Sequence, residues 1–408
     1  MAGSRPHRYE IDMVRALTIV GVMTVHTTWF TNSSTSFWAN MVMDCLHYTR
    51  EVFLFMTAFV LFYNYYHRPA NWPQFWKRRF LLVGAPYVVW SAAYLLYGQT
   101  YTPTLGGYLS KLGFDLVTGT AWFHLYYLLI TMQIYVIMPI FVWLVKKTEG
   151  YHLWLMSAAV LVEAAMMFIF QYEPAWVTGW WGPFGAIMQY RGQVFFTYEA
   201  YLMAGALLAV HLDEVHRFLV AHQRALVRAL LASLGVMVAA FVFAVEVQHQ
   251  SVAFGAAVLQ PFMVPYALLV IAGSYLLGHN WNLRRDRHPH ISALVLLISD
   301  LSFGLYLMHP MILEDYTRRY GTVLAGLPGI VATPLTLVAV AVTTLIITRL
   351  IGMTPASPWV LGRAAVPLRK RPAAARTPSP APTDASAGGG GAWTASSQVG
   401  TSQAGSTR

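Results

Sequence analysis

Charged residues and cysteine are both scarce in this chain of 408 residues. Lys, Arg, Asp and Glu make up 11% of the chain, against about 25% in ordinary soluble domains, whereas apolar residues reach 57%. This composition excludes a soluble enzyme. The single cysteine, Cys45, excludes an intrachain disulfide and a cysteine cluster for zinc or iron–sulfur. Any catalytic activity of the chain therefore depends on neither a disulfide nor a cysteine-bound metal.

The sequence contains long apolar segments with almost no charged residues. Residues 227–245 and 330–348 meet the length of about 20 apolar residues that a helix needs to cross a hydrocarbon core about 30 Å thick. The sequence predicts an all-α, polytopic membrane helix bundle, with the first span retained rather than cleaved. Ten spans are expected, at 12–30, 46–66, 80–97, 122–144, 152–171, 195–210, 226–246, 255–277, 291–313 and 330–351.

Lys and Arg are distributed unevenly between the two sets of loops. If the N-terminus is cytoplasmic, the outer loops hold only Lys111, Arg191, Arg318 and Arg319, and the other loops and the tail hold most of the basic residues. The positive-inside rule then predicts that both termini are cytoplasmic. We therefore explain most of the net charge of +10 by topology in a plasma or inner membrane, and expect no nucleic-acid partner.

The composition changes near Pro355 to one rich in Pro, Ala, Ser, Thr and Gly. Such a segment cannot bury a core, so we predict a transmembrane domain at 1–354 and a disordered cytoplasmic tail at 355–408. Basic residues near the start of this tail are expected to lie on anionic lipid: Arg363, Arg369, Lys370 and Arg371.

Arg15 and His26 are ionisable residues inside the first predicted span. Because an ionisable side chain is costly to place inside a membrane, each of the two is a candidate functional residue. Their separation of eleven residues completes about three helical turns and about 16 Å of rise, so both side chains share one face of the helix. Arg15 is then near the cytoplasmic surface and His26 is past the middle of the membrane. The simpler alternatives are a snorkelling anchor for Arg15 and a core histidine bonded to a backbone carbonyl for His26.

A second group of polar side chains is predicted at the outer ends of several spans. We interpret it as one site that includes His26, Glu51, Trp122, His124, Tyr198, Glu199 and His309. The simpler alternative for Glu51 is an ordinary buried ion pair with Arg50, and it is favoured over a catalytic role. Glu163, near the middle of its span, has no partner that can be named from the sequence.

Three adjacent cations, Lys77, Arg78 and Arg79, are predicted at the inner end of the third span, beside Phe75 and Trp76. They are suited to holding phosphate groups, and they are equally suited to fixing the topology. The residues alone do not decide between these two interpretations.

The chain resembles the acyltransferase 3 family of multi-spanning membrane acyltransferases over about residues 9–352. The spacing from Arg15 to His26 in RALTIVGVMTVH is similar to the hallmark of that family. Five further motifs follow in the same order as in the family: VFLFMTAFVLF (52–62), FWKRRFLLVGAPYVVW (75–90), FHLYYL (123–128), FFTYEAYLMAGALLA (195–209) and LSFGLYLMHP (301–310). Thr57 and Ala58 stand where Ser-Gly is usual, and Tyr126 where Trp is common. These differences indicate a subgroup similar to the members that modify exopolysaccharides.

This resemblance implies transfer of an acyl group, commonly acetyl, from a cytoplasmic acyl-coenzyme A to a hydroxyl of an extracytoplasmic glycan or similar acceptor. The donor phosphates are expected near Arg15, Lys77, Arg78 and Arg79, and His26 is expected to be the general base or to form an acyl-imidazole. The remaining polar residues would bind or orient the acceptor: Glu51, Trp122, His124, Tyr198, Glu199 and His309. We expect no metal and no tightly bound cofactor, with acetyl-coenzyme A as a co-substrate.

Two other functional classes remain open. The first is an exporter or flippase of a polysaccharide or glycolipid, which ten spans with polar groups at both ends would also fit. It is disfavoured because no inverted repeat is evident between sets of spans. The second is a catalytically silent membrane subunit, which is disfavoured because the Arg15 and His26 pair is intact. No hydrolase-like domain is seen after the last span, so the chemistry is expected to finish in the membrane unit or with a separate partner.

Overall fold

The computed structural model describes residues 7–172, 185 and 189–366, and every regular element within these ranges is helical. The all-α class is therefore confirmed. The longer elements are α1 (Tyr9–Thr31), α2 (Phe37–Leu46), α3 (Thr49–Tyr65), α4 (Trp72–Arg79), α5 (Ala85–Gly98), α6 (Leu105–Thr118), α7 (Tyr126–Lys147), α8 (His152–Tyr172), α11 (Glu199–Val210), α12 (Leu212–Ala221), α13 (Gln223–Val242), α15 (Met263–Asn282), α16 (Pro289–Ala325) and α17 (Gly329–Ile351). The short elements are α14 (Val252–Gly255), α18 (Ser357–Val360), the π-helical turns η1 (Phe80–Gly84) and η5 (Phe243–Val247), and the 3₁₀ turns η3 (Arg191–Gln193), η4 (Phe195–Tyr198) and η6 (Arg285–Arg287).

Eight helical segments of the described chain are long and apolar enough to cross a membrane, or nine if one bent pair counts as a span. This is fewer than the ten expected. The segment expected at 195–210 is present with those bounds, but it counts as a candidate span only together with α12, from which it is bent by 102°. The span expected at 255–277 is only partly present as α15, which begins at Met263 and has His279, Asn280 and Asn282 in its last turn. These polar residues leave its apolar stretch short.

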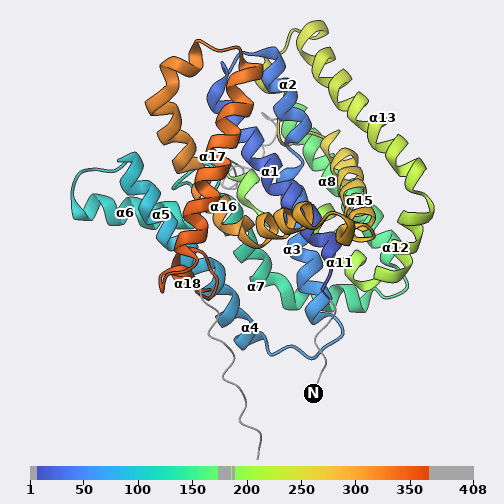
Figure 1. Ribbon diagram of the computed structural model, residues 1–408. Helices are drawn as coiled ribbons and strands as arrows, with labels where there is room; N and C mark the ends of the chain where they lie inside the picture. Colours follow the sequence, from blue (N-terminus) through green and yellow to red (C-terminus); the bar gives the residue numbers. More distant parts are fainter. Residues whose placement is uncertain (1–6, 173–184, 186–188, 367–408) are drawn as a thin grey trace, which may run out of the picture. The chain divides into compact units, whose positions relative to one another are not determined.

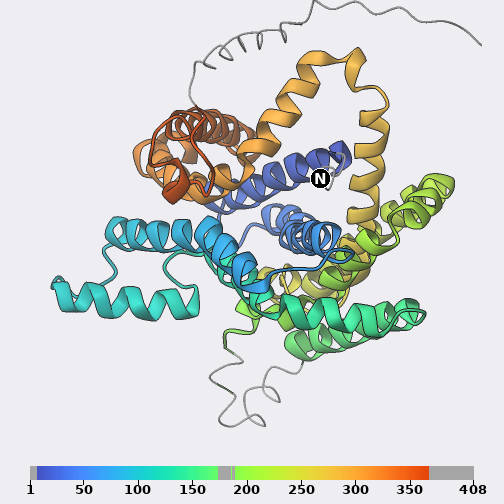
Figure 2. The same cartoon turned by 90° about the horizontal axis from the view of Figure 1, so that it is seen from below.

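Helix α1 occupies the centre of the bundle and contacts α2, α3, α15, α16 and α17. Figure 1 shows it in the middle of the bundle, and Figure 2 shows it between α3 and the long α16. Because it has neighbours on several sides, many of its polar residues are buried: Glu10, Asp12, Thr18, Thr27 and Thr28. The position of α1 thus brings the two candidate residues Arg15 and His26 into the interior.

Helices α3 and α11 pack against each other so closely that one position must be glycine. A Cβ atom on Gly205 would collide with the carbonyl oxygen of Phe55 and would lie 2.9 Å from the backbone nitrogen of Phe59. Ala58, the small residue between them on α3, also faces this contact. Small residues at both surfaces allow the two backbones to approach, as is common between membrane helices.

Helix α16 continues past Pro310 to Ala325, so the end expected at residue 313 was wrong. Proline removes a backbone hydrogen bond and usually bends or ends a helix. Here the hydroxyl of Tyr94 donates to the carbonyl of Leu307 at 2.8 Å and accepts from the backbone N–H of Met311 at 3.3 Å. A neighbouring helix therefore satisfies backbone groups on both sides of the proline, and the helix is maintained.

The predicted tail at 355–408 lies mostly outside the described residues, including Arg369, Lys370 and Arg371. Its first part, up to Val366, includes α18, whose Val360 carbonyl accepts a hydrogen bond of 2.9 Å from Nε1 of Trp90. Arg363 follows and forms an ion pair of 2.9 Å with Asp300 of α16. The division at residue 354 stays a prediction.

Candidate active site

His26 of α1 forms a pair with His309 of α16, although 283 positions separate the two residues in the sequence. Nδ1 of His26 is 2.7 Å from Nε2 of His309, and the rings are stacked at a centroid distance of 5.0 Å. His309 is completely buried, whereas His26 is half-buried and faces a cavity. The fold thus brings together two of the residues that the sequence singled out.

The hydrogen bonds of His309 determine which nitrogen of His26 is available. Nδ1 of His309 is 2.8 Å from the carbonyl oxygen of Leu305, and since a carbonyl can only accept, this Nδ1 donates. A neutral His309 then has only a lone pair at Nε2, which accepts the Nδ1–H of His26. Nε2 of His26 is left with its lone pair, and it has no hydrogen-bond partner within the described residues. It is the nitrogen that can accept a proton.

The cavity beside His26, which we call the His26 cavity, has a volume of about 160 Å³. Phe123 contacts the imidazole of His26 edge-on, at a ring-centroid distance of 4.8 Å. His124 lies next to it in the wall, 2% exposed, with its ring centroid 5.9 Å from that of His309. The remaining wall combines apolar and polar side chains: Val22, Val25, His47, Thr49, Arg50, Phe53, Tyr126, Tyr127, Val258 and Tyr306.

Arg50 lines the His26 cavity, and a carboxylate outside the cavity lining compensates its charge. Its Nη2 is 2.5 Å from Oε1 of the buried Glu51, and its guanidinium lies 4.5 Å from the ring centroid of Tyr198. Nη1 also donates to the hydroxyl of Tyr126 at 3.4 Å. The buried ion pair favoured for Glu51 is therefore present. Glu51 and Tyr198 contact Arg50 and do not themselves line the cavity.

Trp122 and Glu199 lie outside the lining of the His26 cavity. Trp122 stacks on Tyr94 with the ring centroids 5.0 Å apart, and Glu199 begins α11 in a half-buried position. Glu163, whose partner the sequence did not reveal, accepts the backbone N–H of Ala200 at 2.7 Å. This carboxylate satisfies one of the backbone N–H groups that every helix leaves free at its start.

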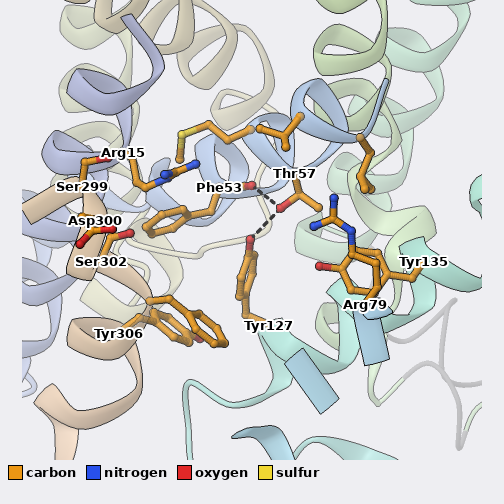
Figure 3. A pocket seen from close by; sticks show the side chains of 14 residues that line it. Arg15, Phe53, Thr57, Arg79, Tyr127, Tyr135, Ser299, Asp300, Ser302 and Tyr306 are labelled. Atoms are coloured by element: carbon orange, nitrogen blue, oxygen red, sulfur yellow. Dashed lines mark hydrogen bonds between the residues drawn. The ribbon is translucent and has the colours of Figure 1, made fainter. Parts of the chain in front are cut away.

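A second cavity, which we call the Arg15 cavity, has a volume of about 280 Å³. Arg15 of α1 and Arg79 of α4 reach into it from opposite sides, with Thr57 between them (Figure 3). Within the described residues neither guanidinium forms an ion pair, and Arg79 is held 5.8 Å from the ring centroid of Tyr135. Among the described residues that line it, Asp300 is the one carboxylate, and it is paired with Arg363. This cavity therefore offers two cations to an anionic ligand.

Lys77 and Arg78 occupy the same last turn of α4 as Arg79, but they are exposed and do not line the Arg15 cavity. Successive helical residues point about 100° apart, since a turn takes about 3.6 residues. Only one of the three adjacent cations can therefore face inward at this level. The structure brings Arg15 and Arg79 together and leaves Lys77 and Arg78 at the surface.

The two cavities are neighbours, because Phe53, Tyr127 and Tyr306 line both. These three residues were within the sequence motifs but were not singled out as site residues. Tyr306 precedes His309 by three positions, so helical periodicity placed it on the same face. Phe53 and Tyr127 come from two other helices, and no signal in the sequence connected them.

The part of the chain that the structure describes contains no group of three or more His, Cys, Asp or Glu side chains placed to hold a metal ion. The side chains that line the two cavities supply imidazole, guanidinium and hydroxyl groups. Those are suited to proton transfer and to binding phosphate.

Comparison with known proteins gives one finding. A family model described as an acyltransferase domain matches residues 8–353, which is most of the chain and includes every candidate residue discussed above. No curated protein and no solved structure gives a significant match.

Proposed function

The chain belongs to the acyltransferase 3 family, and from this premise we propose a donor, an acceptor and a mechanism for it. It is a multi-pass membrane protein with acyltransferase activity. We propose that it moves a short acyl group, acetyl in the simplest case, from cytoplasmic acyl-coenzyme A to a hydroxyl of an extracytoplasmic glycan. The observation that carries this proposal is the pair of adjacent cavities. Within the described residues, the two arginines of one cavity form no ion pair, and Nε2 of the histidine in the other has no hydrogen-bond partner.

The Arg15 cavity is the proposed site for the phosphates of the donor. Guanidinium groups form paired, charge-assisted hydrogen bonds with phosphate oxygens. Arg15 and Arg79 are directed into the cavity, and Lys77 and Arg78 are exposed beside it, where they raise the local concentration of an anionic donor. With the N-terminus in the cytoplasm, this cavity is the one that cytoplasmic coenzyme A reaches.

His26 is the proposed general base on the acceptor hydroxyl. Nε2 of His26 takes the hydroxyl proton while the hydroxyl oxygen forms a bond to the carbonyl carbon of the thioester. The carbon–sulfur bond then breaks, and the proton passes from Nε2 to the departing sulfur, which gives an ester and free coenzyme A. The bond from Nδ1 to His309 holds the imidazole in position throughout. A positioned base of this kind contributes about 10²–10⁴-fold to the rate.

The acceptor is proposed to bind at the His26 cavity, between His124 and Arg50. Both residues line this cavity beside His26 and can form hydrogen bonds with sugar hydroxyls. The differences from the usual motifs at Thr57, Ala58 and Tyr126 support an acceptor of the exopolysaccharide class.

Release of free coenzyme A tests the proposal. Membranes that contain the protein are given acetyl-coenzyme A, and His26→Ala is expected to lower the release by about 10²–10⁴-fold. His216→Ala is the matched control, because His216 lines neither cavity, and it should leave the rate unchanged. Equal amounts of inserted protein are verified by gel filtration in detergent. Undiminished release by the His26 variant would remove this residue from the mechanism.

A further inference from the structure

Three aromatic rings separate the Arg15 cavity from the His26 cavity. Phe53 of α3, Tyr127 of α7 and Tyr306 of α16 line both cavities, so they form the boundary between them. Their ring centroids are 5.9 Å apart for Phe53 and Tyr127, 6.4 Å for Phe53 and Tyr306, and 5.6 Å for Tyr127 and Tyr306. These distances are those of rings in mutual contact, so the three side chains close a triangle. We call it the three-ring constriction.

Two of the three rings are fixed at their hydroxyl groups. Tyr127 shares a hydrogen bond of 3.1 Å with Thr57, which in turn donates to the carbonyl of Phe53 at 2.9 Å, as Figure 3 shows. The hydroxyl of Tyr306 donates to the backbone carbonyl of His124. Phe53 has no polar atom in its side chain, so packing alone holds its ring. It is the member that can rotate at the lowest cost.

The free volume on the two sides of the constriction differs. The His26 cavity has about 160 Å³, compared with about 280 Å³ for the Arg15 cavity. Apolar side chains line the smaller cavity near His26, among them Val22, Val25 and Phe123. A small apolar group fits this space, whereas a bulky group would compete with the acceptor for it.

We propose that the three-ring constriction is a size filter that restricts the donor to thioesters of short, unbranched acyl groups, with Phe53 as the main determinant. This inference rests on the proposed function, because a donor held at Arg15 and Arg79 must pass its acyl end between the rings to reach His26. A linear arm passes once the ring of Phe53 rotates. A branched acyl group is wider than the unbranched β-alanyl-cysteamine end of the arm directly behind it, and it is rejected at the rings that their hydrogen bonds hold in place.

The test compares three donors with each variant: acetyl-, butyryl- and isobutyryl-coenzyme A. The wild-type protein is expected to release coenzyme A fastest from acetyl-coenzyme A and slowest from isobutyryl-coenzyme A. Phe53→Ala should raise the isobutyryl-to-acetyl ratio of rates by about tenfold or more, since one methyl group of steric exclusion typically changes selectivity by that factor. Phe53→Leu should give an intermediate ratio. Because each ratio is internal to one variant, it is independent of the amount of folded protein.

Phe55→Ala is the matched control, since Phe55 is a buried aromatic residue of the same helix and lines neither cavity. It should leave the ratio unchanged even if less protein folds. A Phe53→Ala ratio equal to that of the wild type would overturn the size filter while leaving the proposed function intact. The proposed function itself fails separately, if the wild-type protein releases coenzyme A from none of the three donors, or if His26→Ala releases it as fast as the wild type.

Discussion

At the residue scale, we propose for His309 a positioning role that differs from the role proposed for His26. It receives the Nδ1–H of His26 at 2.7 Å and is itself tied to the carbonyl of Leu305 at 2.8 Å. This chain of two hydrogen bonds selects the tautomer of His26 and fixes the plane of its ring. Without it, the imidazole of His26 can rotate and present the wrong nitrogen to the acceptor.

Substitution of His309 tests this role. His309→Ala should lower kcat by a factor smaller than the about 10²–10⁴-fold loss expected for a missing base, because His26 remains present but is poorly oriented. The KM for acetyl-coenzyme A should not change. His309→Gln keeps an acceptor near the position of Nε2 and should recover part of the loss. Equal losses in both variants, or a raised KM, would indicate a general packing role instead.

The three adjacent cations of α4 give a second test at this scale. Arg79→Ala should raise the KM for acetyl-coenzyme A about tenfold or more, because a hydrogen bond to a charged group contributes about 1.5–3 kcal/mol. Lys77→Ala should have a much smaller effect, since Lys77 is exposed and lines neither cavity. Steady-state kinetics over a range of donor concentrations distinguishes the two. A larger effect at Lys77 than at Arg79 would contradict the proposed phosphate site.

Some of these residues could be found from the sequence and others could not. The relation between Arg15 and His26 depends only on helical periodicity, which the sequence contains in full. The contact of His26 with His309 and the inward direction of Arg79 depend on how helices pack, and a single sequence does not specify that. The sequence did not predict the three-ring constriction for the same reason, since its three rings come from three helices.

At the element scale, the close contact of α3 and α11 positions the wall of the site. Helix α3 provides Arg50, Phe53 and Thr57, and its opposite surface is fixed against α11 through Gly205. An added methyl group at this contact would displace α3 and move all three side chains relative to α1. The precision of the site therefore depends on a glycine that does not line either cavity.

Gly205→Ala is expected to destabilise the protein. The added Cβ would collide with the backbone of α3, and such overpacking typically costs about 1–3 kcal/mol. Gly235→Ala is the control, because a Cβ on Gly235 of α13 would have no heavy atom within 4 Å and alanine favours a helix. Thermal unfolding in detergent should show a lower Tm for the first variant and an equal or higher Tm for the second. An unchanged Tm for Gly205→Ala would mean that the helices separate freely.

The helices themselves were largely predictable, because hydropathy and length determine where an apolar helix forms. The boundaries that failed have local causes. Tyr94 maintains α16 beyond Pro310, and its hydrogen bonds come from a helix about 200 residues away in sequence. The end of α11 at Val210 agrees with the expected span, because the polar run His211 to Arg217 follows it, whereas the bend of 102° into α12 depends on packing that the sequence does not specify.

At the scale of the whole molecule, the two cavities define the proposed direction of acyl transfer. Arg15 and His26 line two adjacent cavities along one face of α1, and about 16 Å of helical rise separates them. Arg79 lines the first of these cavities from α4. The uneven distribution of Lys and Arg predicts that the arginines are on the cytoplasmic side. The donor and the acceptor would then enter from opposite sides of the membrane and meet at His26.

Sealed vesicles of opposite orientation test this claim most directly. Inside-out and right-side-out membrane vesicles from the same cells are given acetyl-coenzyme A labelled in the acetyl group. Intact acetyl-coenzyme A does not cross the bilayer. We expect label in envelope glycan only in the inside-out vesicles, where the cytoplasmic face is exposed, and we expect the His26→Ala variant to abolish it. Incorporation of label in sealed right-side-out vesicles, dependent on His26, would contradict entry of the donor through the Arg15 cavity from the cytoplasm.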